Sequence, residues 1–164
     1  MPADYTEEEV KKAREVLYDE GIKMRYKVAG KEYVDQALKA ADPDYGRHMQ
    51  EYVTEVCWGS IWTRPGLELK TRSLLNIAMM CALNRSPELA VHTRGAMNNG
   101  ATEEEIREVV LQASCYCGMP AGMEAFKVTG EAIKSWYKDK EAKGHSVERH
   151  SDVGVADRMK EEDL

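Results

Sequence analysis

The stretch from Leu74 to Leu83 constrains the fold more than any other, because Asn76 is its only polar residue. The run is too short to span a membrane, which requires about 18 or more apolar residues. A helix that is apolar almost all round is buried on every side. A chain of 164 residues forms one domain of ordinary size, which can hardly surround such a helix alone. We therefore expect a central helix over 69–84 that also contacts another subunit.

The rest of the chain has the spacing and the caps of helices. No segment alternates apolar and polar residues with the period of two that is typical of strands. Thr6 and Thr102 each stand three positions before a glutamate, which is the capping-box pattern. The sequence thus predicts a single all-α domain over 1–143, a bundle of six to seven helices. The helices are expected at 7–21, 31–41, 43–58, 69–84, 86–99, 103–117 and 121–140, with a linker at 22–30 and a loop at 59–66.

Composition narrows the possible partners and the location of the protein. Hydrophobic residues make up 43% of the chain, which is enough for a core, and the net charge is -6. Proteins that bind nucleic acid carry basic patches, so the acidic balance argues against that partner and gives no support for an anionic membrane. The acidic, polar N-terminus is unlike a secretory signal. We expect a cytoplasmic protein that binds neither nucleic acid nor membrane.

The last residues differ in composition from the rest. The segment 144–164 has many charges and few large apolar residues, so burial there cannot offset the entropy of ordering. It is predicted to be a disordered tail or an arm that clasps a neighbouring subunit. His145 and His150, which lie in this segment, are expected to be solvated.

The four cysteines are expected to be reduced and to act as small hydrophobic residues. Cys115 and Cys117 would point in divergent directions on one helix, roughly 200° apart at about 3.6 residues per turn, so they cannot pair without breaking it. The chain has no Cys/His spacing typical of metal sites, no phosphate-binding glycine loop and no nucleophile elbow. We expect neither a metal ion nor a cofactor.

One helix carries a candidate acid/base pair. Ser86 is a good N-cap and Pro87 suits the first helical position. Glu88 and His92 then lie one turn apart on the same face. A carboxylate beside an imidazole can fix the ring and favour its protonated form. The spacing alone is more typical of a solvated surface pair.

Several motifs together resemble the carboxymuconolactone decarboxylase family, and the similarity runs from about residue 18 to residue 133. The resemblance implies an alkylhydroperoxidase-like helical fold and a closed homo-oligomer, either a homotrimer or a homohexamer. The motifs occur in the order Trp62-Thr63-Arg64-Pro65-Gly66-Leu67, Thr71-Arg72-Ser73-Leu74, His92-x-Arg94, Asn98-Asn99-Gly100, Glu104-Glu105-Ile106 and Tyr116-Cys117-Gly118-x-Pro120-Ala121.

The resemblance favours the decarboxylase branch over the redox branch. Alkylhydroperoxidase-like relatives carry Cys-x-x-Cys-x-x-x-His, and alignment on His92 places their cysteines at Arg85 and Glu88. Neither is cysteine here, so the nucleophilic and resolving thiols are missing. The decarboxylase branch has glutamate at the second position, as this chain does. A thiol peroxidase that uses Cys115 and Cys117 remains an alternative.

The resemblance further implies a cofactor-free carboxy-lyase. Its substrate would be a small carboxylated lactone of aromatic (protocatechuate/β-ketoadipate) catabolism. His92 would be the general acid, oriented by Glu88, and Arg72 or Arg64 would hold a carboxylate or the developing oxyanion. Tyr116, Cys117 and Trp62 complete the expected substrate contacts.

Each of these binding residues also has a structural interpretation. Arg72 can pair with a glutamate, Arg64 can shape a turn, a buried helix end explains Tyr116 and Cys117, and Trp62 can pack the loop.

The chain also departs from the family pattern. Val56 and Lys127 stand where family decarboxylases often have histidine. This leaves open a related decarboxylase, isomerase or cyclase that acts on another metabolite in a biosynthetic pathway. A non-catalytic binding or scaffold oligomer is the remaining alternative.

Overall fold

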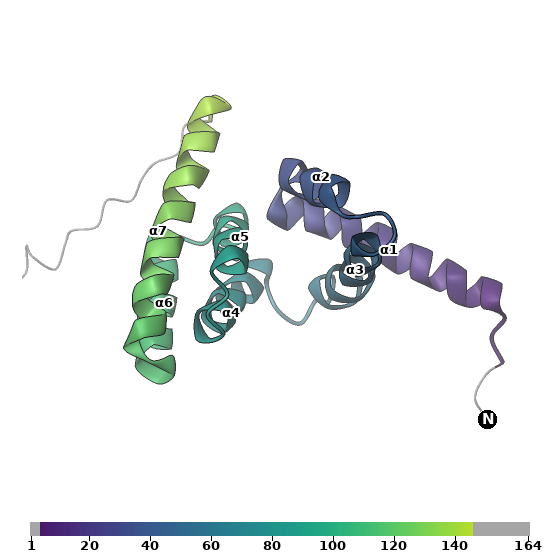
Figure 1. Cartoon of the computed structure of the whole chain (residues 1–164), viewed down its shortest axis with the longest axis horizontal. Helices are drawn as coiled ribbons and strands as arrows, with labels where there is room; N and C mark the ends of the chain where they lie inside the picture. Colours follow the sequence, from purple (N-terminus) through teal and green to yellow (C-terminus); the bar gives the residue numbers. More distant parts are fainter. Residues whose placement is uncertain (1–3, 146–164) are drawn as a thin grey trace, which may run out of the picture.

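The computed structural model describes residues 4–145 and contains only helices within that range (Figure 1). The expected all-α bundle of six to seven helices is confirmed, and one π-helix is added. The expected tail lies almost wholly outside the described residues. The elements are α1 (Glu7–Ala29), α2 (Lys31–Ala40), α3 (Gly46–Tyr52), η1 (Val53–Trp62), α4 (Leu69–Ala82), α5 (Ser86–Asn98), α6 (Glu103–Cys117) and α7 (Met119–Ala142).

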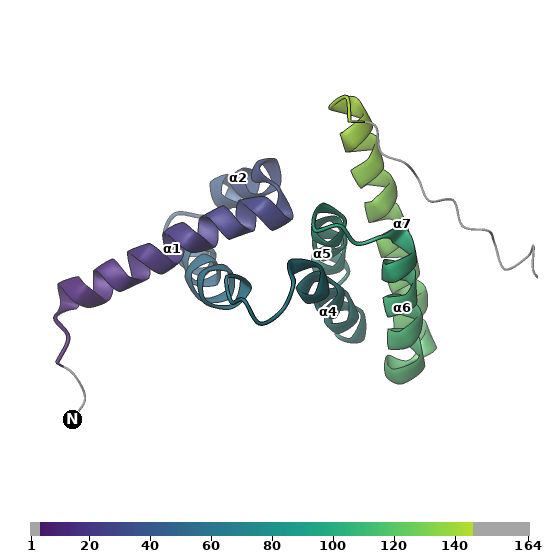
Figure 2. The same ribbon diagram turned by 180° about the vertical axis from the view of Figure 1, so that it is seen from behind.

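The helices form two groups, which Figures 1 and 2 show from opposite sides. Helices α1, α2, α3 and η1 form the N-terminal group, and α4 to α7 form the C-terminal group. Each group has its own hydrophobic cluster. The larger cluster lies among α4 to α7 and includes Ile77, Leu89, Ile106 and Trp136. The smaller cluster lies between α1 and η1, where Val28, Trp58 and Trp62 are buried.

Helix α1 does not end near Gly21 but continues to Ala29, so the expected linker at 22–30 is wrong. Gly21 is needed because two backbones touch there: a Cβ at this position would lie 2.1 Å from the carbonyl oxygen of Thr54. Gly59 makes the reciprocal approach to Leu17. The helix ends at Gly30, whose φ of 89° suits glycine.

The expected loop at 59–66 is also partly helical, because η1 continues to Trp62. The Ser60 hydroxyl donates to the carbonyl of Glu55, five residues earlier, at 3.4 Å, which fits the wide π turn. Trp58 and Trp62 are both buried, and their rings stack with centroids 4.8 Å apart. This stacking fits the structural interpretation of Trp62 as a residue that packs this segment.

Helix α4 is buried on one side only within the single chain, as expected of a domain too small to surround it, and its burial by another subunit stays a prediction. Ile77 and Cys81 are inaccessible, whereas Leu75 and Met79 are 49% and 48% exposed. The apolar residues therefore form two faces, an inner one against α5 and α6 and an outer one. A homotrimer or homohexamer that covers the outer face stays a prediction.

Local signals at the helix ends were mostly accurate. Both capping boxes are present, with Thr6 paired to Glu9 and Thr102 paired to Glu105. Ser86, however, is the first residue of α5 rather than its N-cap, and its hydroxyl donates to Glu124 of α7 at 3.2 Å. Ser86 thus ties the start of α5 to the last helix.

Candidate active site

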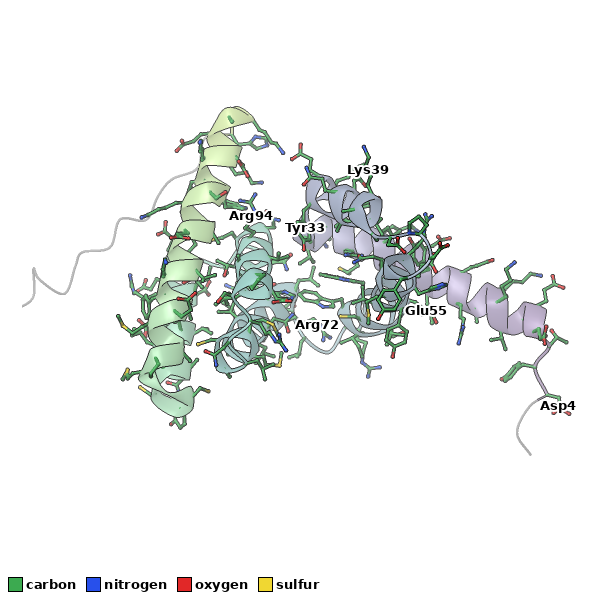
Figure 3. All side chains as sticks on the ribbon, viewed as in Figure 1. Asp4, Tyr33, Lys39, Glu55, Arg72 and Arg94 are labelled. Carbon is green, nitrogen blue, oxygen red and sulfur yellow. The ribbon has the colours of Figure 1, made fainter. Side chains whose placement is uncertain are left out.

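Helix α5 directs Glu88 and His92 into a cavity of about 370 Å³. The opposite walls come from the N-terminal group, so the cavity lies where the two groups of helices meet. Tyr33, labelled in Figure 3, reaches it from α2. The lining is mostly apolar around a few polar groups, which is typical of small-molecule sites. The lining residues are Arg25, Ala29, Tyr33, Val53, Trp58, Pro87, Glu88, Val91 and His92.

The side chain that contacts the His92 ring is Asn76 of α4. Its amide nitrogen lies 3.4 Å from Nδ1 of the ring. The Asn76 side-chain amide has both a donor and an acceptor, so it can hydrogen-bond Nδ1 of the neutral ring in either tautomer. Within residues 4–145, no hydrogen bond joins Glu88 to His92. Orientation of the ring by Glu88 therefore stays a prediction, and the side chain that contacts the ring is Asn76, which was not among the predicted site residues.

Burial dominates the electrostatics of His92. The pKa of the ring is lowered from its ordinary value of 6.5, because desolvation disfavours the charged form more than Glu88 favours it. The expectation that the imidazolium is favoured is wrong for this reason. Glu88 is exposed, so water weakens its effect. Once protonated, the ring is a stronger acid than an ordinary imidazolium, because its surroundings favour release of the proton.

Arg25 is the functional candidate that sequence reasoning missed. Its side chain lines the cavity from α1 and the residue is only 6% exposed. The guanidinium donates to the Thr54 hydroxyl at 3.0 Å and to the Gln50 side-chain oxygen at 2.8 Å. Burial lowers the pKa of Arg25, although an arginine remains charged at any working pH. A cation from α1 thus lines the same cavity as His92 of α5.

Arg72 and Arg64 are brought together, but neither lines the cavity. Arg72 donates from Nη2 to the backbone carbonyl of Arg64 at 3.0 Å, while its buried Nε has no hydrogen-bond partner. Arg72 lies one turn before Asn76 on α4 and between the two groups of helices in Figure 3. In the isolated chain, Arg72 holds the loop before α4. Its role in substrate binding, and that of Arg64, stays a prediction.

The other predicted substrate contacts lie away from His92. Trp62 is buried and stacks on Trp58. Trp58 lines the cavity, whereas Trp62 does not. Tyr116 and Cys117 end α6, where Tyr116 is 81% exposed, so the expected buried helix end is wrong for the single chain. Cys115 is exposed as well and borders a different surface cavity, between α6 and α7. The structure therefore separates all three residues of this helix end from the acid/base pair.

The positions that depart from the family pattern do not line the cavity either. Val56 of η1 is 38% exposed, and Lys127 of α7 is exposed. Arg94, which follows His92 in the His-x-Arg motif, turns away to α7 and donates to Asp139 at 2.6 Å. In the isolated chain, none of these three side chains lines the cavity.

Among residues 4–145, no three His, Cys, Asp or Glu side chains gather closely enough to hold a metal ion. None of the described helices is long and apolar enough to cross a membrane.

Comparison with known proteins identifies relatives along most of the chain. The model of the carboxymuconolactone decarboxylase family matches residues 47–131. A nitrosuccinic acid decarboxylase of Metarhizium robertsii is 49% identical over 133 residues, which cover 81% of this chain and 90% of that protein. A 4-carboxymuconolactone decarboxylase of Acinetobacter baylyi is 38% identical over 120 residues, which cover 73% and 89%. His92, Glu88 and Asn76 lie inside the family match, whereas Arg25 and Tyr33 precede it.

Proposed function

The chain belongs to the carboxymuconolactone decarboxylase family, and on that premise we propose that it is a carboxy-lyase for a small dicarboxylic acid. The departing carboxylate is attached to a carbon whose electron pair can move onto an electron-accepting group when the carbon–carbon bond breaks. Two similar proteins are named for decarboxylation, which supports the reaction type. The observation that carries the proposal is the half-buried His92 in a largely apolar cavity.

The first candidate substrate is nitrosuccinate or a close α-nitro acid. The relative named for this acid has the higher identity and the longer match of the two decarboxylases. In this molecule the carbon that loses carbon dioxide also bears the nitro group. The carbon–carbon bond breaks, and its electron pair moves onto the nitro group to form a nitronate. A proton on the same carbon then completes 3-nitropropanoate.

The residues of the cavity suit both halves of this reaction. Val53 and Val91 can strip water from the departing carboxylate, because their side chains offer it no hydrogen bonds. Protonated His92 then gives its proton to the carbanionic carbon and recovers one from solvent. The lowered pKa of the ring assists this transfer. The balance is one proton consumed and one carbon dioxide released per turnover.

The second candidate is a carboxylated lactone such as 4-carboxymuconolactone, which would place the enzyme in aromatic catabolism. The family match and the Acinetobacter relative favour it. Here the electron pair moves through the ring double bond to the lactone carbonyl. The requirements on the site are the same: an apolar wall, fixed donors for the oxyanion and one acid.

Release of carbon dioxide from the two purified substrates tests the proposal. We expect turnover of nitrosuccinate with a higher kcat/KM than that of 4-carboxymuconolactone, after subtraction of spontaneous loss without protein. The reverse order would assign the second candidate. No enzymatic release from either compound would overturn the proposed function.

A further inference from the structure

Arg25 is a buried cation without an acidic partner. Residues 4–145 place no carboxylate within 4.0 Å of its guanidinium, and both of its hydrogen-bond partners, Thr54 and Gln50, are neutral. Arginine is almost never fully buried unless it is paired, because desolvation of its charge is costly. By contrast, the arginines among residues 4–145 that form ion pairs, Arg14, Arg47, Arg94 and Arg107, have side chains at least 33% exposed. The chain therefore maintains an uncompensated charge at the wall of the candidate site.

The shape of the group indicates the kind of anion that would neutralise it. A guanidinium has five N–H donors in a planar fork, and Thr54 and Gln50 take only one each from Nη1 and Nη2. The remaining donors match the two oxygens of a carboxylate. The cavity of about 370 Å³ limits the ligand to a small acid, and Arg25 is the one arginine or lysine among its lining residues.

We propose that Arg25 binds the carboxylate that the substrate keeps, and so restricts the enzyme to dicarboxylic acids. This inference rests on the proposed function. A cation bound to the departing carboxylate would slow the reaction, because it would stabilise a charge that leaves in the transition state. Bound to the other carboxylate, the same cation holds substrate equally before and during the bond cleavage. Arg25 comes from α1 and His92 from α5, so the anchor and the acid reach one bound molecule from different helices.

A matched pair of substrates tests this role in the full-length protein. Nitrosuccinate and 2-nitrobutanoate share the departing carboxylate and the nitro group, and they differ only in a carboxylate or a methyl group at the far end. We expect Arg25→Gln to lower kcat/KM for nitrosuccinate by at least about 30-fold, the usual minimum for loss of one partner of a buried charge pair. Turnover of 2-nitrobutanoate should change little. Arg47→Gln, an exposed arginine of α3, is the control and should alter neither substrate.

Binding without turnover separates this inference from the proposed function. Succinate keeps both carboxylates but has no electron-accepting group, so it cannot react. It should bind the parent protein in calorimetry, whereas butanoate should not, and Arg25→Gln should abolish the succinate signal. Arg25→Lys, which keeps the charge, covers the case in which the glutamine variant fails to fold, and it should bind succinate more weakly than the parent. An equal loss for nitrosuccinate and 2-nitrobutanoate, or undiminished succinate binding by Arg25→Gln or Arg25→Lys, would overturn the inference.

Discussion

The Asn76 amide nitrogen lies 3.4 Å from Nδ1 of His92, so the fourth helix supplies the contact that the fifth helix does not. Asn76 is the one polar residue of the long apolar run in α4. Its neighbour Ile77 is buried against the core. The apolar run of α4 thus has a second role beside packing, because it carries the side chain that contacts the His92 ring.

The pH dependence of kcat/KM should show the low pKa of His92. A general acid must be protonated, so kcat/KM should fall as the pH rises through the pKa of the free enzyme, with a midpoint below 6.5. Glu88 favours the protonated ring, so Glu88→Gln should move this midpoint to lower pH. Ionisation of the substrate affects parent and variant alike and cancels in the difference. A midpoint that rises in Glu88→Gln would contradict this assignment.

Substitution of Asn76 should shift the same profile in the opposite direction. Asn76→Asp places a carboxylate at Nδ1, which favours the imidazolium, so the midpoint should move to higher pH. Asn76→Leu has a similar size without the charge and serves as the control. It should lower kcat without raising the midpoint. Identical profiles for the aspartate and leucine variants would show that residue 76 does not contact the ring in solution.

Substitution of Gly21 tests the junction of α1 and η1. In Gly21→Ala the new methyl group meets the Thr54 carbonyl at 2.1 Å, so the two backbones must separate. We expect a loss of about 3 kcal/mol in the free energy of unfolding, near the upper end for overpacking. Urea denaturation measures it. Gly66→Ala, where nothing lies within 4 Å of the added carbon, should change stability by far less; equal effects of the two substitutions would contradict the close contact.

The thiols should be dispensable for catalysis. Cys115 and Cys117 are exposed on α6 and do not line the cavity of His92. Cys115→Ser and Cys117→Ser should each keep the decarboxylation rate within about twofold of the parent, since a surface substitution outside the site alters little. Peroxide consumption with a thiol donor should be negligible in the parent. Robust peroxide turnover that disappears in either variant would favour the redox branch instead.

The features predicted correctly from the sequence depend on residues that are close along the chain. A capping box joins residues three apart, and Thr6 with Glu9 shows it as the pattern predicts. Gly21 was predicted to end a helix, but it permits close contact of two helix backbones. A single sequence does not distinguish these two uses of glycine, because the contacting residue, Thr54, is far away along the chain. The error concealed Arg25, since a linker has no buried face. On a continuous helix, Gly21, Arg25 and Val28 share one face, which is the signal that would have found it.

The protonation of His92 was misjudged for a related reason. The sequence places the charge of Glu88 four residues away, but it does not show how deeply the ring is buried. Burial of the ring depends on the other helices that pack against α5, and it outweighs the neighbouring charge. Similarly, the Asn76 contact requires the packing of α4 against α5.

The role of His92 as the general acid is tested most directly by the turnover of His92→Ala. General acid catalysis typically contributes about 100- to 10,000-fold, so kcat on the preferred substrate should fall within that range while KM changes far less. His48→Ala, which removes an exposed histidine of α3, should retain the parent kcat. Circular dichroism and light scattering would establish that both variants fold and assemble like the parent. A correctly assembled His92→Ala protein that releases carbon dioxide at nearly the parent rate would contradict the account.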